Sequence, residues 1–489
     1  MNFPMELDAP TFVYAQWLFL KFLALNYFFA FGSLFLQIKG LYGTQGILPI
    51  NELLSHIKKR TGGKIPFRDA PTFFWVNSKD FTLELTAFLG MVASLLVIGG
   101  VCPAPLFFFL WAAYLSFLTV GSVFLSFQWD ILLVEVGFIA IFFSLQTPPP
   151  ILMIYLLWIV LFRLIFSSGV VKWISGCPEW RALKAMEYHF ETQPIPNRLA
   201  FYSHILAKLF TKLFDIGVNF FEIAVPFLIF TPQPLRYVGF VLTVFFQILI
   251  MLTGNYAFFN TLTIALCIPL LDATYLQGWF AEIPTITAFE PNVYLSVALN
   301  FIAGILILWN VLELISLFYP LGRIDKLFIR LAPFRIVNSY GLFARMTTER
   351  NEIIIEGSDD GTYWKAYEFK WKPGDPKFPP RQVAPHQPRL DWQMWFAALS
   401  SYQYNPWFVR FLERLLEGSP DVLGLLKTNP FPLNPPKYIR SMFYQYHFTD
   451  LRTKRKTGMW WTRTLKGHYS PVYSIQKKDH LGGFTTLDH

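Results

Sequence analysis

Nine apolar segments, most of them near twenty residues long, dominate the first two thirds of the chain. An apolar run of about 18 or more residues is typical of a transmembrane helix, because about 20 helical residues cross the hydrocarbon core of a bilayer. The fourth and eighth segments are the shortest. The sequence therefore predicts an α-helical polytopic membrane protein with about nine spans. The segments occupy residues 11–38, 81–101, 106–126, 131–146, 151–168, 213–230, 237–253, 257–271 and 294–319.

The composition supports this class. The 489 residues are 54% hydrophobic and 19% aromatic, and only 15% are charged, whereas a soluble globular chain has about 25% charged residues. The composition therefore excludes an ordinary soluble protein.

The composition changes near residue 330. Residues 335–489 contain 22 Lys/Arg and 14 Asp/Glu, against 19 and 18 in the preceding part, so they carry +8 of the net +9. They contain no membrane-length apolar run. We therefore predict a transmembrane domain over residues 1–330 and a soluble domain over residues 331–489 that folds as a separate unit. Because its basic residues are scattered, we do not expect a nucleic-acid partner.

The pattern within this soluble domain is mixed. Two β-rich runs flank the turn Ser358–Gly361, and an Asp-Gly turn between such runs indicates a hairpin. These features favour a β-sandwich-like fold with helical insertions. Helices are expected at Leu390–Leu399 and Asn405–Gly418, and further strands at Lys437–Phe448 and Met459–Leu465.

The loop predicted after the fifth apolar segment carries an unusual number of reactive side chains. Lys172 comes first, and a lysine partly removed from water has a lowered pKa and can act as a base. The alternative is a lysine that lays its stem on apolar surface and holds its charge in water. Trp180, His189 and Glu191 are further loop candidates, with a solvated loop face as their alternative. A lone histidine does not provide a metal site, so no metal is expected.

Polar residues within or near the apolar segments form a second group of candidates. Charges inside a membrane are costly and are functional by default. The alternative is that they pair with one another and hold the bundle together; for Arg163 the partner would be Glu84, Glu135 or Glu222. The intramembrane candidates are Asp130, Glu135, Arg163, Glu222 and Asn255.

Loop charges bear on orientation. With nine spans, the loops 39–80 and 168–212 lie on the same side as the C-terminal domain, and they carry seven and six Lys/Arg. The opposite loops carry only Arg236. The positive-inside rule then places the C-terminal domain in the cytoplasm, unless these residues are basic for a functional reason.

Several segments resemble signatures of the lipase maturation factor family. The likeness extends from the first half of the helical part nearly to the C-terminus. It is carried by FQWDILLVEVGF (Phe127–Phe138), FRLIFSSGVVKWISGCPEW (Phe162–Trp180), YHFETQPIP (Tyr188–Pro196), LTGNYAFFNTLT (Leu252–Thr263), IVNSYGLF (Ile336–Phe343), YEFKWKPGDP (Tyr367–Pro376), HQPRLDWQMWFAAL (His386–Leu399) and MWWTR (Met459–Arg463).

The resemblance implies a membrane protein that helps secreted lipases to fold and assemble. It implies an endoplasmic reticulum membrane in a eukaryote, and we expect the inner membrane in a bacterium. It also implies that the C-terminal domain lies in the lumen or periplasm and engages the lipase, which opposes the positive-inside argument. We follow the family on this point.

A more remote resemblance concerns chemistry. The stretch SGVVKW (Ser168–Trp173) is similar to the segment of vitamin K-dependent γ-glutamyl carboxylase that holds its catalytic lysine, and Lys172 falls on that lysine. The histidine that this enzyme uses has no counterpart, because Leu132 stands near its place. The likeness implies a common scaffold without implying common chemistry.

Two functional hypotheses follow. In the first, the C-terminal domain binds client lipases, with Arg389, Asp391, Trp392, Trp395 and Phe396 as candidate contacts. Tryptophan and arginine dominate binding hot spots, although an aromatic stripe at helical spacing is also typical of a core. In the second, the protein is a membrane enzyme that uses Lys172 as a base on a lipid or quinone-like ligand between the helices. Membrane lipids are expected partners in both.

Overall fold

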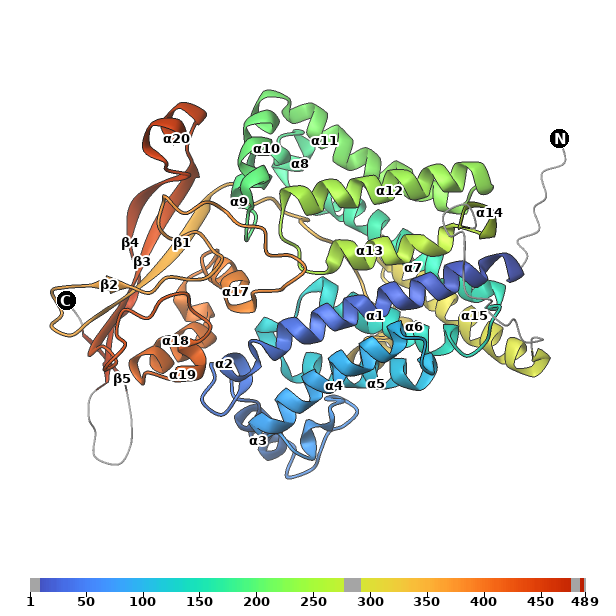
Figure 1. Cartoon of the computed structure of the whole chain (residues 1–489), viewed down its shortest axis with the longest axis horizontal. Coiled ribbons are helices and arrows are strands. Elements are labelled where there is room, and N and C mark those ends of the chain that lie inside the picture. The colour runs from blue at the N-terminus through green and yellow to red at the C-terminus, as the bar shows by residue number, and fades with distance from the viewer. Residues whose placement is uncertain (1–8, 277–291, 476–483, 488–489) are drawn as a thin grey trace.

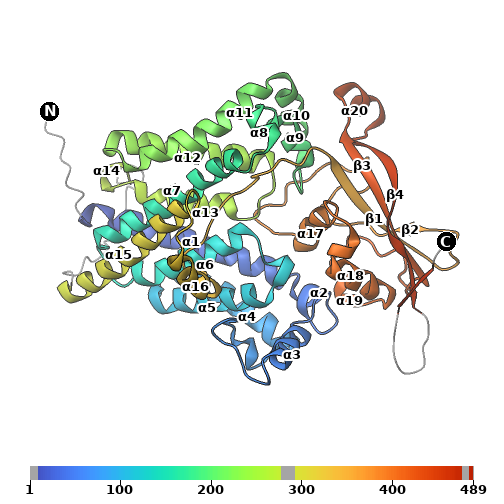
Figure 2. The same cartoon turned by 180° about the vertical axis from the view of Figure 1, so that it is seen from behind.

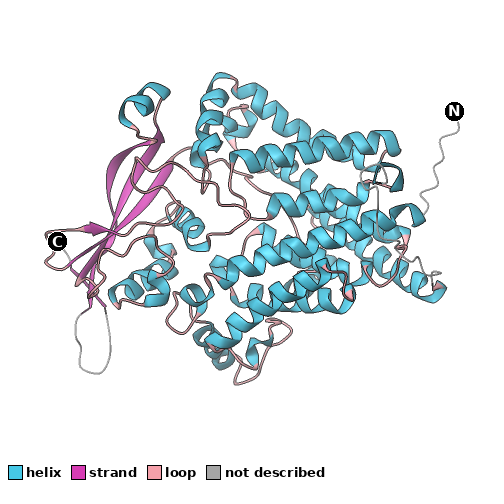
Figure 3. Ribbon diagram, in the orientation of Figure 1, coloured by secondary structure: helices cyan, strands magenta, loops and turns pink. Residues whose placement is uncertain are grey.

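The computed structural model describes residues 9–276, 292–475 and 484–487. Long helices fill one end of the molecule and a β-sheet stands at the other (Figure 1). All described strands lie at that second end, beyond a group of short helices (Figure 3).

Seven helices in the described part are long and apolar enough to cross a membrane, which fits a multi-pass membrane protein. The fourth and eighth predicted segments form the shorter helices α6, Gln128–Phe143, and α13, Phe259–Cys267. The prediction of nine spans is therefore not confirmed. The seven helices are α1 (Val13–Phe35), α4 (Asp80–Ile98), α5 (Pro103–Val120), α7 (Ile151–Ile174), the irregular helix Thr211–Phe230 that begins as α11 (Thr211–Asn219), α12 (Gln233–Thr253) and α15 (Val293–Ser316).

The two shorter helices nevertheless run along the bundle. In the first turn of α6, Asp130 contacts the C-terminal domain. Beyond the end of α6, Gln146 Nε2 lies 2.8 Å from Ser296 Oγ in the first turn of α15. Just before α13, Asn255 Nδ2 donates to Arg381 O at 2.8 Å. Both helices therefore begin at the end of the bundle that faces the sheet (Figures 1 and 2).

Short helices cluster at that end. They belong to the loops 39–80 and 168–212, and both loops contact the C-terminal domain. Ser419 Oγ donates to Gln45 O at 2.8 Å, and Arg350 Nη1 donates to Glu191 O at 2.8 Å. These helices are α2 (Ile38–Tyr42), α3 (Ile50–Arg60), α8 (Pro178–Arg181), α9 (Ala185–Thr192) and α10 (Arg198–Leu209).

The C-terminal domain has one antiparallel sheet of five strands among the described residues, in the order β2-β1-β3-β4-β5. The predicted hairpin is present, because Gly357 pairs with Lys365 and Gly361 adopts a φ of +76° in the turn. The strands are β1 (Arg350–Ser358), β2 (Lys365–Ala366), β3 (Tyr438–Phe448), β4 (Trp461–Ile475) and β5 (Phe484–Leu487).

The predicted sandwich is not confirmed, because helices form the second layer. The two predicted helices are α17 (Arg389–Ala397) and α18 (Pro406–Leu416), and Gly418 with φ +71° follows the second. On β4, Tyr469 donates its hydroxyl to Ala397 O at 2.8 Å and lies 5.1 Å from the ring of Phe408. The apolar faces of α17 and α18 thus cover the side on which a second sheet would pack.

Candidate functional site

A cavity of about 610 Å³ lies between α7, α11, α12 and α13. Its wall is mostly aliphatic and aromatic, with a few polar side chains. Three sequence candidates, Lys172, Trp180 and His189, line it together with the intramembrane candidate Glu222. The remaining polar lining includes Tyr256, Gln247 and Asn260.

Lys172 lies in the last turn of α7 and not in a loop, because the helix continues past residue 168 to Ile174. Its side chain is 3% exposed, so its ammonium does not reach outward to water. It donates to the carboxylate of Glu222 and to Ser168 O at 3.0 Å, and it lies 5.2 Å from the ring centroid of Trp180. The lysine is therefore an ion-paired group inside the cavity.

Two backbone features bring this ion pair together. Glu222 lies in a π-helical turn, Phe220–Ala224, and such turns are frequent at functional sites because they redirect side chains. Opposite it, Gly169 lets α7 approach closely, since an added Cβ would meet Ile223 Cγ1 at 2.8 Å. Gly169, the glycine of SGVVKW, is therefore explained by the close packing of α7 against the π-helical turn.

His189 begins a hydrogen-bond chain at the same end of the cavity. Its Nε2 lies 3.2 Å from the hydroxyl of Tyr256, which donates to Gln193 Oε1 at 2.9 Å. Burial lowers the pKa of His189 to about 4, and the nearby charge of Lys172 adds to this shift. The imidazole is thus neutral at pH 7.

Trp180 and Glu191 have different surroundings. Trp180 Nε1 donates to Phe343 O at 2.9 Å, and its ring forms part of the cavity wall. Glu191 is not among the cavity residues. Its carboxylate accepts from Phe448 N at 2.8 Å and lies 3.1 Å from His447 Nδ1, both on β3. Glu191 therefore ties the 168–212 loop to the sheet.

Arg163 pairs with one of its three predicted partners, Glu135, and both side chains are buried. The second oxygen of Glu135 accepts from Tyr340 Oη at 2.7 Å and from Asn338 Nδ2 at 2.9 Å. Glu84 pairs instead with Lys39. The pairing hypothesis therefore describes Arg163 correctly.

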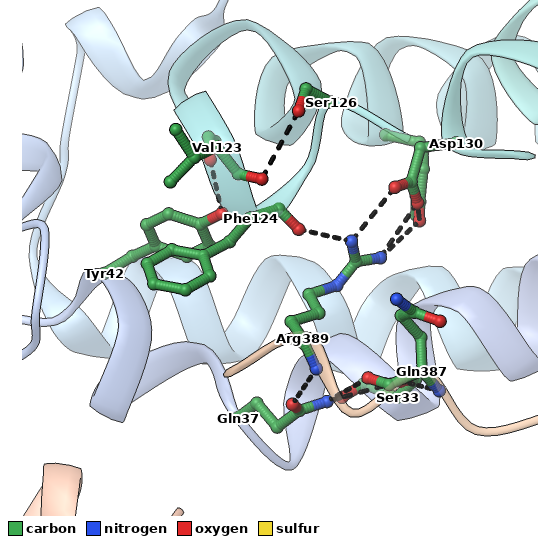
Figure 4. Close-up of polar contacts among 11 residues, drawn as sticks. Ser33, Gln37, Tyr42, Val123, Phe124, Ser126, Asp130, Gln387 and Arg389 are labelled. Carbon is green, nitrogen blue, oxygen red and sulfur yellow. Dashed lines mark hydrogen bonds and ion pairs between the residues drawn. The ribbon is translucent and has the colours of Figure 1, made fainter. Parts of the chain in front are cut away.

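Asp130 forms a buried, two-pronged ion pair with Arg389 (Figure 4). Arg389 Nη2 donates to Asp130 Oδ1 at 2.8 Å and Nη1 donates to Oδ2 at 3.0 Å. Nη1 also donates to Phe124 O at 2.7 Å, and the backbone N–H of Arg389 donates to Gln37 Oε1 at 2.9 Å. Arg389 is thereby bound to three parts of the bundle: α6, the turn before α6 and the segment after α1.

Asn255 connects the bundle and the C-terminal domain in a similar way. Its Oδ1 accepts from Val383 N at 2.7 Å and from Ala384 N at 3.1 Å. Three of the five intramembrane candidates, Asp130, Glu135 and Asn255, therefore form hydrogen bonds with residues beyond 330, and a fourth, Arg163, lies over the ring of Tyr340. The side chains of the first three provide hydrogen-bond partners for buried polar groups of the C-terminal domain where it meets the helices.

The structure corrects the client-contact hypothesis for four of its five residues. Arg389, Asp391, Trp392 and Trp395 are at most 8% exposed, whereas Phe396 is 40% exposed. The four are buried because α17 lies between the bundle and the sheet (Figure 1). A partner that contacts this helix therefore meets Phe396.

The contacts of the buried four are internal. Asp391 Oδ1 accepts the backbone N–H groups of Trp371 at 2.8 Å and Lys372 at 2.9 Å. Burial raises the pKa of Asp391 to about 6, although these N–H donors oppose the shift. The ring of Trp392 lies 4.9 Å from that of Trp129 on α6. These side chains pack the junction between the two domains.

The cavity residues that were not predicted as site residues include the polar side chains of Tyr256, Asn260 and Gln247. Tyr256 and Asn260 lie within LTGNYAFFNTLT, and Asn260 Nδ2 donates to Gln247 Oε1 at 2.8 Å. The available signal was a polar side chain inside an apolar segment, which applies to Gln247 and Asn260 as it does to Glu222. Leu132, at the place of the carboxylase histidine, is buried and does not line the cavity.

No cluster of three or more His, Cys, Asp or Glu suited to a metal ion occurs within residues 9–276, 292–475 and 484–487.

Comparison with known proteins agrees with this division into a helical part and a C-terminal part. Residues 14–278 match the lipase maturation factor transmembrane domain, and residues 336–471 match the lipase maturation factor C-terminal domain. The chain belongs to the lipase maturation factor family. The predicted family resemblance is thereby confirmed.

Individual relatives cover nearly the whole chain. Lipase maturation factor 2 of Gallus gallus is 35% identical over 94% of this chain and 81% of its own length. Lipase maturation factor 1 of Bos taurus is 34% identical over 99% of this chain and 92% of its own length. Lipase maturation factor 2 of Homo sapiens is 33% identical over 94% and 82%. No solved structure matches the chain.

Proposed function

We propose that this protein is a membrane-bound, chaperone-like factor that assists the folding and assembly of secreted lipases. The observation that carries the proposal is the extent of the likeness. Both the transmembrane and the C-terminal domain match the lipase maturation factors, and relatives with that name align over 91–99% of the chain.

The proposed client surface is the outer edge of β4. This strand pairs with β3 from Trp461 to Ser474, but β5 covers only Val472–Ile475. Among the described residues, the stretch Thr462–Lys466 has no strand on its outer side, and all five side chains are exposed. An uncovered edge presents unpaired backbone N–H and C=O groups, which bind an extended polypeptide by strand addition. An incompletely folded lipase offers such segments.

We expect Leu465→Asp to reduce lipase capture severalfold without lowering the abundance of the protein. Leu465 is 52% exposed, so the substitution leaves the core intact, while it removes the apolar side chain against which an added strand would pack. The measurement is co-purification of a secreted lipase with the full-length protein, together with secreted lipase activity. Leu433→Asp is the matched control, because Leu433 is 92% exposed in the segment before β3. Equal capture by both variants and the parent protein would argue against the edge as the client surface.

A second candidate function is favoured by one observation, the burial of Lys172 within the cavity. In this alternative the protein is a membrane enzyme in which Lys172 acts as a base on a lipid or quinone-like substrate. The replacement of the carboxylase histidine by Leu132 does not support carboxylase chemistry.

Lys172→Arg distinguishes the two functions, because arginine keeps the positive charge and does not deprotonate. For a client-binding factor we expect nearly normal lipase output. For an enzyme that needs Lys172 as a base, output falls by a factor on the order of 10² at normal abundance. Lys208→Arg, at an exposed position of α10, is the control. Full activity of Lys172→Arg excludes the base.

We further propose the cellular setting. In a eukaryote the protein lies in the endoplasmic reticulum membrane, and in a bacterium in the inner membrane. The C-terminal domain lies in the lumen or periplasm, on the same side as the loops 39–80 and 168–212. This placement requires that α6 and α13 both cross the membrane and that the total number of crossings is odd. It puts the β4 edge in the compartment where secreted lipases fold. Residues 1–330 and 331–489 are proposed as its two structural units.

A further inference from the structure

The cavity has the size and the wall of a small-molecule site. Ligand pockets are typically about 300–1,000 Å³, mostly apolar, with a few placed polar groups. The cavity of about 610 Å³ fits this description, since Phe214, Phe221, Phe246 and Ile250 contribute to a largely apolar wall. An apolar space of this size within a helical bundle is suited to an apolar molecule.

The cavity opens toward the surrounding bilayer. Leu213 and Leu249 both line it, and they are 67% and 39% exposed on the outside of α11 and α12. Both helices belong to the segments apolar enough to span a membrane. In a membrane, the opening between α11 and α12 therefore faces the hydrocarbon region.

One end of the cavity is polar. Lys172 lies in the last turn of α7 and His189 on α9, both at the end nearest the C-terminal domain, and Tyr256 joins them. An ammonium carries three N–H bonds, and the contacts of Lys172 within the described residues, with Ser168 and Glu222, use two. The cavity thus combines a long apolar body with hydrogen-bonding groups at one end.

The charges at this end select the head group. The carboxylate of Glu222 already neutralises Lys172, so a buried anion finds no net positive charge to offset its desolvation. A neutral oxygen-bearing head accepts hydrogen bonds without this cost.

We propose that the cavity binds a neutral membrane amphiphile, with its apolar part between α7, α11, α12 and α13 and a carbonyl or hydroxyl head group against Lys172, His189 and Tyr256. The site is independent of the client surface on β4, so it adds a lipid ligand to a protein-binding role. Two sources supply this chemistry, a glyceride and an isoprenoid quinone.

The substitution Gly217→Phe tests the site. Gly217 lines the cavity, and a Cβ added there meets no atom within 4 Å, so a phenylalanine ring occupies the space of the ligand without a backbone clash. Gly304→Phe on α15 is the matched control. It is also a helical glycine with nothing within 4 Å of an added Cβ, and it does not line the cavity.

The experiment uses the full-length protein in lipid nanodiscs with three photoactivatable probes: a diacylglycerol, a ubiquinone analogue and a fatty acid. Crosslinked peptides are identified by mass spectrometry. We expect the diacylglycerol or the quinone to label α11 and α12 peptides in the parent protein and in Gly304→Phe, and labelling to fall about tenfold or more in Gly217→Phe. The neutral probe that labels identifies the source, and the fatty acid anion labels less.

Competition keeps the test decisive if Gly217→Phe fails to fold. In the parent protein, an excess of the unlabelled neutral amphiphile abolishes specific labelling of the cavity peptides. The proposal is overturned if neither neutral probe labels these peptides, if labelling resists competition, if a folded Gly217→Phe protein labels like Gly304→Phe, or if the anion is preferred.

Discussion

Arg389→Ala is expected to loosen the C-terminal domain from the helical bundle and to deplete the protein in the membrane. Arg389 and Asp130 are both fully buried, so removing the guanidinium leaves an uncompensated carboxylate at the junction of the two domains. Breaking a buried ion pair in this way costs about 3–5 kcal/mol. The backbone of Phe124 loses a donor as well.

Arg410→Ala is the matched control. Arg410 also pairs across the two domains, with Glu52 on α3, but the two side chains are 40% and 55% exposed. An exposed pair contributes about 0–1 kcal/mol, so this variant should keep its abundance. The double variant Asp130→Ala/Arg389→Ala should lose less stability than the two single variants added together, because it leaves no orphaned charge.

The measurement is abundance in sealed membrane vesicles, followed by limited proteolysis. In sealed vesicles that enclose the luminal side of the membrane, the C-terminal domain lies inside if the proposed units and orientation are correct. Protease added outside then spares this domain until the membrane is opened. A fragment close to residues 331–489 is then released faster from Arg389→Ala than from the parent protein. An abundant Arg389→Ala protein with parental protease resistance would show that the ion pair does not hold the junction.

The helical bundle could be predicted from the sequence because membrane helices depend mainly on local composition. Each of the nine apolar segments overlaps a helix of the bundle. The number of long spans was harder to predict, since α6 and α13 are short. The sequence LTGNY before α13 shows why. The backbone of Gly254 pairs with Pro196, and the side chain of Asn255 accepts a hydrogen bond from Val383 N. Hydropathy alone does not reveal such contacts.

The second layer of the C-terminal domain could not be predicted, because it depends on packing between distant segments. α17 has tryptophans at i and i+3, which fits both a core helix and a binding surface. In the structure α17 is a core helix, because it packs against the sheet on one side and against α6 on the other. Trp392 packs on Trp129, which is 263 residues away in the sequence, and single-sequence patterns carry no information about this contact.

The cavity could be predicted in part. Lys172 and Glu222 were each recognised as unusual charges, but their pairing depends on the π-helical turn and on Gly169, which a hydropathy profile does not detect. Gln247 and Asn260 carry the same signal, a polar group within an apolar segment. The cavity itself exists because the side chains of four helices do not fill the space between them, which is a property of tertiary packing.

Trp395→Ala and Phe396→Ala should separate packing from partner binding on α17. Trp395 is 8% exposed, and its Nε1 donates to Thr192 O at 2.8 Å, so it joins the 168–212 loop to the C-terminal domain. Truncating a buried tryptophan costs about 3–5 kcal/mol. We therefore expect Trp395→Ala to be depleted and to unfold at a lower temperature in detergent.

Phe396→Ala removes the neighbouring ring, which is 40% exposed and lies 4.9 Å from that of Trp395. This variant should remain abundant, with a thermal midpoint close to that of the parent protein. If Phe396 contacts the client, lipase capture falls while abundance is kept; if it only shields Trp395, capture is unchanged. A stable, abundant Trp395→Ala protein with normal capture would contradict the burial argument, because an indole that joins the two domains cannot be lost without a cost in stability.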